Sequence, residues 1–298
     1  DQLAERFRRV APKADFCSLR FVQERTEAIS VRQDVVQPAA SALDVGAMIT
    51  VVSGSGLGYA GTSDLSEDGL RRASEQAMAW AKRTAGRSVI DFSKVPMPRP
   101  EGDYTSPVGI AWDSVPLAER IGIARRESER LGGDPRIVDW EASLVHIDTE
   151  SVYLTADGSR ATQRFRFLVP YLSATANAGA ETQSRSLGGR GMCRQGGLEV
   201  LDHIRYREQA PTLAAEAIQL LEAPNCPSGA MDVVLAPDQM ILQIHESIGH
   251  PLELDRILGD ERNYAGTSFV TPDMFGTYRY GSPLLNVTFD PGVGGEIA

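Results

Sequence analysis

The sequence predicts an α+β protein in three domains, and three observations lead to this prediction. In some stretches apolar and polar residues alternate, as they do in strands with one buried face. In other stretches they recur at helical spacing. Two proline-rich breaks, over residues 95–102 and 223–229, separate these stretches. Because such breaks favour extended linkers over packed structure, the predicted domains cover residues 1–97, 98–225 and 226–298.

The first domain is expected to be a small α/β unit. Residues 16–22 and 47–53 are apolar strand candidates, and the turn at 54–56 contains two glycines, as in a hairpin. After this hairpin, Ser66 can cap a helix whose apolar residues repeat at helical spacing. Gly86 can end that helix, because glycine tolerates the left-handed conformation of a helix end.

The middle domain is expected to be mainly antiparallel sheet with helices. A helix can begin at Ser114 and end at two glycines. A hairpin signal follows, in which residues 152–155 and 165–171 flank the turn Asp157-Gly158. A third helix is predicted over residues 211–222, and the second break then begins the last domain.

The composition argues against several classes of protein. A formal charge of −10 and a pI near 5.0 oppose binding to nucleic acid, which needs a basic surface. No apolar run is long enough to span a membrane, so we expect no membrane association and a cytoplasmic location. The three cysteines, Cys17, Cys193 and Cys226, are widely spaced and odd in number, which fits reduced thiols in a reducing compartment.

Two of the four histidines flank a glutamate in the last domain, in a His-Glu-x-x-x-His pattern. Residues 231–235 are predicted to form a short buried strand, and Asp238 can cap the helix that follows. His245, Glu246 and His250 lie on this helix. Imidazole nitrogens are common zinc ligands, so the pattern suggests a metal site.

The spacing of five residues differs from the spacing of four that places two histidines on one face of a helix. In a regular α-helix, five residues separate the imidazoles by roughly 140° around the axis. We therefore expect the helix to break between them. Gly249 permits a left-handed helix end, and Pro251 disfavours helical geometry at His250, so His250 is expected to become extended and turn back toward His245.

Such a pair suggests the chemistry of a metallopeptidase. Glu246, beside the first histidine, could accept a proton from a metal-bound water. A catalytic zinc site needs a third protein ligand, and with no histidine or cysteine in residues 251–298, Glu253, Asp255 and Asp260 are the carboxylate candidates. The competing interpretation is that His245 and His250 are structural. For the remaining two histidines, His146 and His203, and for the cysteines, a structural role is the better interpretation.

Taken together, these segments resemble the TldD/PmbA family of metallopeptidases, also described as modulators of DNA gyrase. The resemblance rests on the order of six segments, which cover nearly the whole chain: 54–61, 153–158, 233–237, the His-Glu motif at 245–250, Glu253 with Asp255, and 266–269. It implies a mainly-β C-terminal metallopeptidase domain that contains the HExxxH helix. It also implies zinc bound by His245 and His250, with Glu246 as the general base.

The family's third ligand is a cysteine much later in the chain, and no cysteine follows Cys226 here. We therefore expect the sequence to be truncated and its last domain, residues 226–298, to be incomplete. The resemblance further implies a homodimer, or a heterodimer with a paralogous subunit, that hydrolyses unfolded or leader peptides bound as an added strand. The alternative is a non-catalytic dimer subunit or peptide-binding scaffold of the same fold.

Overall fold

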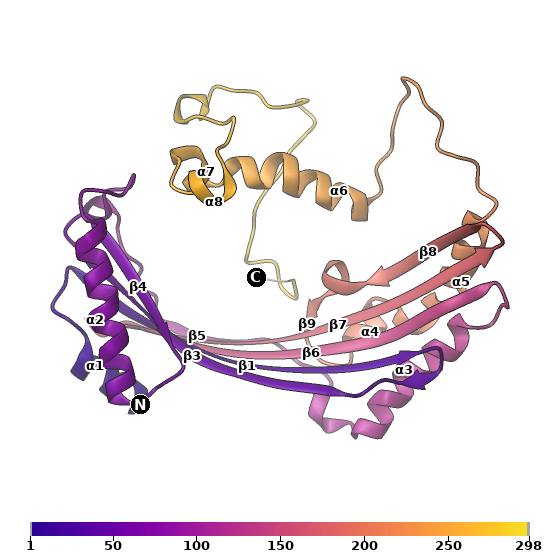
Figure 1. The fold of residues 1–298 in the computed structure, drawn as a ribbon, viewed down its shortest axis with the longest axis horizontal. Coiled ribbons are helices and arrows are strands. Elements are labelled where there is room, and N and C mark those ends of the chain that lie inside the picture. The colour runs from indigo at the N-terminus through magenta and orange to yellow at the C-terminus, as the bar shows by residue number, and fades with distance from the viewer. Residues whose placement is uncertain (1, 297–298) are drawn as a thin grey trace.

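The computed structural model describes residues 2–296 and is built on one long, curved sheet (Figure 1). Within this range the sheet has nine strands, and the main path runs β4-β3-β1-β6-β7-β5, while β2 pairs with β1 and β8 and β9 pair with β7. The strands are β1 (Phe16–Arg32), β2 (Val35–Val36), β3 (Ala40–Ser53), β4 (Gly56–Thr62), β5 (Gly102–Thr105), β6 (Ile137–Thr155), β7 (Arg160–Ala178), β8 (Glu181–Gly188) and β9 (Arg194–Gln195). The mixed helix and antiparallel-sheet class is therefore as predicted.

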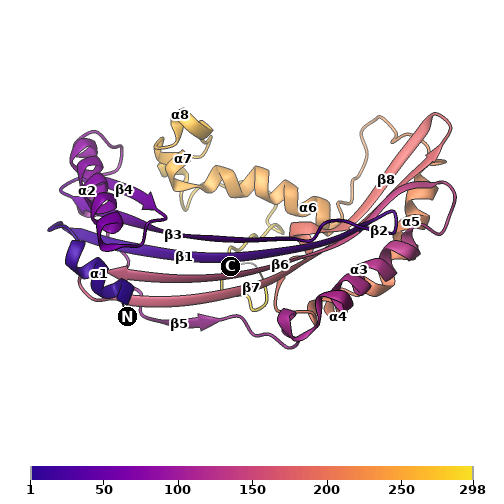
Figure 2. The ribbon, with the colours of Figure 1, turned by 60° about the horizontal axis from the view of Figure 1, so that its bottom comes forward.

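Helices gather at the two ends of the sheet (Figures 1 and 2). One end has α1 (Gln2–Val10) and α2 (Glu67–Thr84), and the other has α3 (Leu117–Leu131), α4 (Val200–His203) and α5 (Tyr206–Leu220). As predicted, Ser66 caps α2, since its hydroxyl accepts a hydrogen bond of 3.1 Å from the Gly69 N–H. None of the helices in the described range is long and apolar enough to cross a membrane.

The strands are longer than the sequence indicated, because pairing extends them beyond their apolar parts. The strand predicted over residues 16–22 continues to Arg32. Its mostly polar second half pairs with β6, whose residues pair with β1 from Ser18 to Arg32, and with β3 as far as Ala28. The predicted hairpin turns at 54–56 and 157–158 are present, joining β3 to β4 and β6 to β7.

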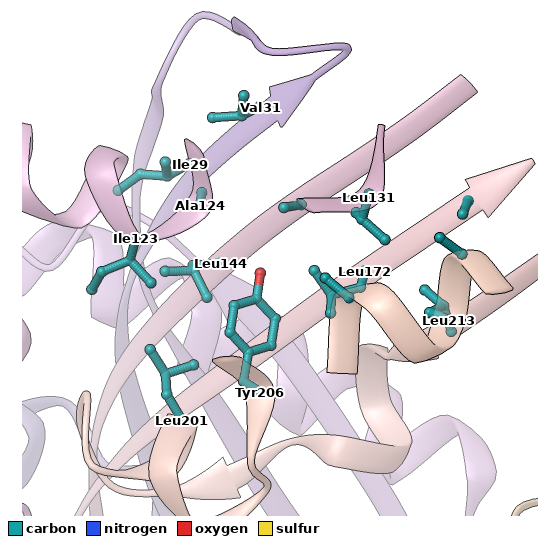
Figure 3. Close-up of a cluster of buried hydrophobic side chains, with 14 of the residues drawn as sticks. Ile29, Val31, Ile123, Ala124, Leu131, Leu144, Leu172, Leu201, Tyr206 and Leu213 are labelled. Carbon is teal, nitrogen blue, oxygen red and sulfur yellow. The ribbon is translucent and has the colours of Figure 1, made fainter. Parts of the chain in front are cut away.

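Two hydrophobic cores lie along this single sheet. One packs α1 and α2 against the sheet around Leu19 and Leu70, both fully buried. The other packs α3, α4 and α5 against it around Leu144, Leu172 and Tyr206 (Figure 3). The division into domains at residues 97 and 225 stays a prediction, and the sheet runs continuously across the first of these positions because β1 pairs with β6.

The last part of the chain lies over the concave side of the sheet (Figures 1 and 2). It contains α6 (Pro237–Ile244), α7 (Leu254–Leu258), α8 (Arg262–Ala265) and shorter helical turns. In residues 226–296, the structure has no strand, so the mainly-β expectation is not met in this range. The strand predicted over residues 231–235 is wrong, since this stretch is irregular and the Val234 side chain is 96% exposed. A strand needs a neighbouring strand, and none lies beside these residues within the described chain.

Candidate metal centre

The two histidines of the motif lie at the ends of a π-helical turn. Helix α6 leads directly into a π-helix over His245–Gly249, and the His250 N–H donates its hydrogen bond to the His245 carbonyl oxygen. This i→i+5 bond brings residues five apart onto one face, which an α-helix does not. A spacing of five therefore suits a single π-turn.

The break predicted between the histidines is wrong. Gly249 has φ −57° and His250 has φ −58°, so the first is not left-handed and the second is not extended. Pro251 acts differently from the prediction: it stands in the first turn of a short 3₁₀ helix, His250–Leu252. In a continued α-helix its ring would clash with the carbonyl of Ser247, so the wider turn avoids this clash. The histidines converge because the helix widens.

The donor atoms of the motif are close together. The imidazole rings of His245 and His250 have centroids 4.3 Å apart and meet edge to face at 71°. One ligand atom from each of His245, Glu246 and His250 can be chosen so that all lie within 4.8 Å of one another. The side chains of His245 and Glu246 are mostly exposed, and that of His250 is half-buried. The site is therefore open to solvent and to a ligand.

Glu253 orients His250. Its Oε1 lies 2.7 Å from His250 Nδ1, and its carboxylate also pairs with Arg256. The hydrogen bond to His250, followed by that to Arg256, lowers the pKa of Glu253 despite some desolvation. A carboxylate on one imidazole nitrogen leaves the other nitrogen, Nε2, as the metal donor and fixes the ring. From the sequence, Glu253 was expected only as a possible ligand, although its i,i+3 spacing from His250 could have suggested this orienting role.

The second candidate ligand, Asp255, belongs to a second acidic group. Glu253, Asp255 and Glu261 can each place a ligand atom within 4.8 Å of the others, and Glu253 joins this group to His250. Arg256 pairs with Glu253 and Glu261. In residues 2–296, the third potential ligand beside the two histidines is Glu246. The structure thus brings together the predicted pair and its glutamate and leaves Asp255 with the acidic group.

The π-turn borders an apolar cavity of about 340 Å³. Ser247 and Pro251 belong to its wall, and Phe269, Phe275 and Tyr280 supply aromatic surface. The Ser268 hydroxyl donates a hydrogen bond of 2.7 Å to the Pro251 carbonyl oxygen, which ties the cavity wall to the turn. An apolar side chain next to the metal centre could be accommodated here.

The histidines and buried cysteines outside the motif have structural surroundings. His146 is 5% exposed and stacks on Trp112, with ring centroids 5.1 Å apart. His203 ends the short helix α4. Cys17 and Cys193 are buried, and burial raises the pKa of the Cys17 thiol to about 12. A thiol so held is a poor ligand and nucleophile.

Comparisons with known proteins relate this chain to a metallopeptidase family. Residues 17–81 match the family model described as PmbA/TldA metallopeptidase domain 1. A metalloprotease of Methanothermobacter thermautotrophicus is 25% identical over 296 residues, which is 91% of this chain and 60% of that protein. A metalloprotease TldD homolog of Haemophilus influenzae is 24% identical, over 81% of this chain and 50% of that protein.

Solved structures agree on the fold. A protein described as a modulator of a DNA gyrase from Thermotoga maritima matches with a TM-score of 0.53 and 15% identity, over 72% of this chain and 46% of that one. A second such protein, from Bacteroides thetaiotaomicron, gives 0.51 and 13% identity, over 74% and 48%. The family model and the named relatives confirm the resemblance to the TldD/PmbA family, and the solved structures agree with it in fold. This chain spans about half to three fifths of the length of these relatives.

Proposed function

We propose that this chain contributes the histidine pair and the general base of a zinc-dependent peptidase that hydrolyses unfolded or leader peptides. The observation that supports this most directly is the convergence of His245, Glu246 and His250 on one π-turn. The names of its relatives support a metallopeptidase. The cytoplasmic location, the homodimer or heterodimer with a paralogous subunit, and a third ligand supplied by a cysteine outside these residues belong to the same proposal.

The residues present fit a zinc ion. Two imidazoles are borderline-soft donors of the kind zinc prefers, and Glu253 holds one of them in the orientation that a ligand needs. Bound zinc would supply Lewis acidity, which polarises a peptide carbonyl and lowers the pKa of water. His245 and His250 would hold the ion.

Glu246 would move the proton. Glu246 Oε1 lies 3.9 Å from His245 Nε2, and the Glu246 side chain is mostly exposed to solvent. There it can accept a proton from the attacking water and pass that proton to the leaving amine. The apolar cavity beside the turn would seat a side chain of the peptide.

The test is Glu246→Gln in the full-length protein. The amide cannot accept the proton, so hydrolysis of an unfolded peptide should fall by roughly 100-fold or more while zinc content stays near one ion per chain. Glu181→Gln, an exposed change on β8, is the matched control and should leave hydrolysis unchanged. Cleavage that survives Glu246→Gln would disprove the proposed role.

Metal analysis separates the enzyme from the scaffold alternative. His245→Ala should abolish zinc binding in the enzyme. A protein that holds no zinc yet binds peptide and dimerises fully would instead be a non-catalytic subunit.

A further inference from the structure

The apolar cavity beside the metal centre is continuous with the turn that carries the two histidines. Ser247 and Ile248 lie inside the π-turn His245–Gly249, and both form part of the cavity wall, as does Pro251. A side chain seated in the cavity therefore belongs to a residue next to the peptide bond on which the metal centre would act.

The size and lining of the cavity favour one large apolar side chain. Its volume of about 340 Å³ is at the lower end of the range of about 300–1,000 Å³ for ligand pockets, so it has room for a side chain but not for a longer segment. Phe269 and Tyr280 line it as a stacked pair, with ring centroids 5.9 Å apart and planes inclined at 19°. Phe275 and Leu285 add further apolar surface. An aromatic or long aliphatic side chain would bury much apolar area here, and a small one would not.

Hydrogen bonds hold this lining to the metal-binding turn. The Ser268 hydroxyl, which donates to the Pro251 carbonyl oxygen, also accepts a hydrogen bond of 2.9 Å from the Val270 N–H. Val270 lines the cavity and is the most buried side chain in the described part of residues 226–296. The lining is therefore fixed relative to the histidines before a ligand binds, which lowers the cost of binding.

Arg279 adds a positive charge to a lining that is otherwise uncharged among the described residues. In residues 2–296, no carboxylate lies within ion-pair distance of Arg279, whereas Arg256 pairs with both Glu253 and Glu261. A guanidinium without a partner attracts a carboxylate and can bind it through two parallel hydrogen bonds. The group that complements the cavity in charge is therefore a carboxylate close to the apolar side chain.

We infer that this cavity, named here the apolar subsite and formed around Phe269, Tyr280 and Arg279, selects the substrate residue beside the scissile bond. That residue has a large apolar side chain, and a neighbouring carboxylate meets Arg279. The carboxylate comes from an adjacent acidic side chain or from the C-terminus of the peptide. The inference rests on the proposed function and adds the class of substrate to it.

Peptide binding to the full-length Glu246→Gln protein tests the apolar subsite, because this variant should leave the peptide uncut. The probes are short fluorescein-labelled peptide amides with the central pair Phe-Asp, Ala-Asp or Phe-Asn, and fluorescence anisotropy gives the Kd. We expect the Phe-Asp peptide to bind roughly tenfold or more tightly than the Ala-Asp peptide. It should bind a few-fold more tightly than the Phe-Asn peptide, since the ion pair with Arg279 is exposed.

A fourth peptide, which ends in Phe with a free carboxylate, distinguishes the two sources of that group. Binding as tight as that of the Phe-Asp peptide would assign the C-terminus to Arg279. Binding as weak as that of the Phe-Asn peptide would assign an acidic side chain.

Two further variants assign the contacts. Tyr280→Ala removes one ring of the stacked pair and should reduce the preference for Phe over Ala roughly fivefold or more. Tyr264→Ala, at a side chain 92% exposed outside the lining, is the matched control and should leave the preference unchanged. Arg279→Glu should reverse the charge preference by a few-fold, toward a Phe-Lys peptide. Arg25→Glu, at an exposed position on β1, is its matched control.

Equal binding of the Phe-Asp and Ala-Asp peptides would overturn the inference, as when another part of the full-length protein covers the cavity. A preference that survives both Tyr280→Ala and Arg279→Glu would also overturn it. When the unchanged protein cuts the Phe-Asp peptide, mass spectrometry should place the cut at a bond of the Phe residue, and a cut elsewhere would contradict the inference. If the unchanged protein cuts none of the peptides while the binding preference persists, the apolar subsite stands and the proposed catalysis fails.

Discussion

At the scale of single residues, hydrogen-bond partners decide the role of each ionisable group. Glu253 is one residue among several acidic ones, and its 2.7 Å contact with His250 Nδ1 distinguishes it as an orienting group. The sequence predicted correctly that His245 and His250 converge with Glu246. The i,i+3 spacing of His250 and Glu253 is compatible with two roles, because a carboxylate near a metal site can bind the metal or a ligand of the metal, and only geometry separates the two.

Removing the carboxylate of Glu253 should therefore weaken zinc binding without removing a ligand. We expect Glu253→Ala to raise the Kd for zinc about 10- to 100-fold, since His250 loses its fixed orientation. Glu253→Gln should recover part of this affinity, because an amide oxygen can still accept from Nδ1–H. Competition with a chromophoric chelator gives the Kd. If Glu253→Ala binds zinc as tightly as the unchanged protein, the orienting role is excluded.

His146 should make stability depend on pH. Burial lowers the pKa of His146, and the opposing influence of Asp148, Asp113 and Glu27 is smaller. Since the folded pKa lies below the ordinary value near 6.5, the unfolded chain binds more protons just below that pH. The stabilisation that comes from holding His146 neutral in the folded state is therefore fully present above about pH 6.5. It is lost as the pH falls from about 6.5 to the folded pKa of His146.

Urea unfolding between about pH 5 and pH 8, followed by intrinsic tryptophan fluorescence, measures this dependence. His146→Gln removes the titrating group and should flatten the curve in that interval. His203→Gln is the matched control and should leave the curve unchanged. The Trp112 indole also donates a hydrogen bond to Glu27, and that bond is the main cause of the lowered pKa of Glu27. The stabilisation that Glu27 contributes is therefore lost only below about pH 4.5, outside the measured interval.

At the scale of elements, the sequence predicted those that depend on local signals. Ser66 caps α2 and the two hairpin turns are present, because caps and turns are set by a few neighbouring residues. The second half of β1 was missed because it is mostly polar, and it is a strand through its pairing with β6 and, over part of its length, with β3 and β2. The π-turn was missed for a different reason: Pro251 was judged by its bias on His250, while its ring clash with Ser247 determines the geometry.

That explanation predicts the effect of removing the proline. In Pro251→Ala the clash disappears and an N–H becomes available to the Ser247 carbonyl, so a regular α-turn becomes accessible. The imidazoles would then diverge by roughly 140°, and zinc binding should weaken about tenfold or more. Pro237→Ala is the matched control, since Pro237 is the first residue of α6 and its missing N–H has no role there. Equal zinc affinity in Pro251→Ala and the unchanged protein would refute this account.

At the scale of the whole molecule, one sheet joins two cores that the sequence had assigned to separate domains. The core around Leu19 and the core around Leu144 lie on strands that are directly paired, because β1 and β6 share a continuous ladder. A linker with alternate prolines over residues 95–102 is a sound signal for a chain break, yet it says nothing about whether strands on its two sides pair. Long-range pairing is the part of a fold that local patterns leave open.

This continuity predicts that both cores unfold together. Leu19 and Leu144 are fully buried, so Leu19→Ala and Leu144→Ala should each lower the free energy of unfolding by about 2–5 kcal/mol. Leu43→Ala, at a side chain 55% exposed, is the control and should change it by less than about 0.5 kcal/mol. In scanning calorimetry, each core variant should shift one common transition for residues 1–225, since breaking either core removes the strands on which the other is packed. Two resolved transitions, with Leu19→Ala moving only one and Leu144→Ala moving only the other, would show instead that the predicted boundary at residue 97 separates independent folding units.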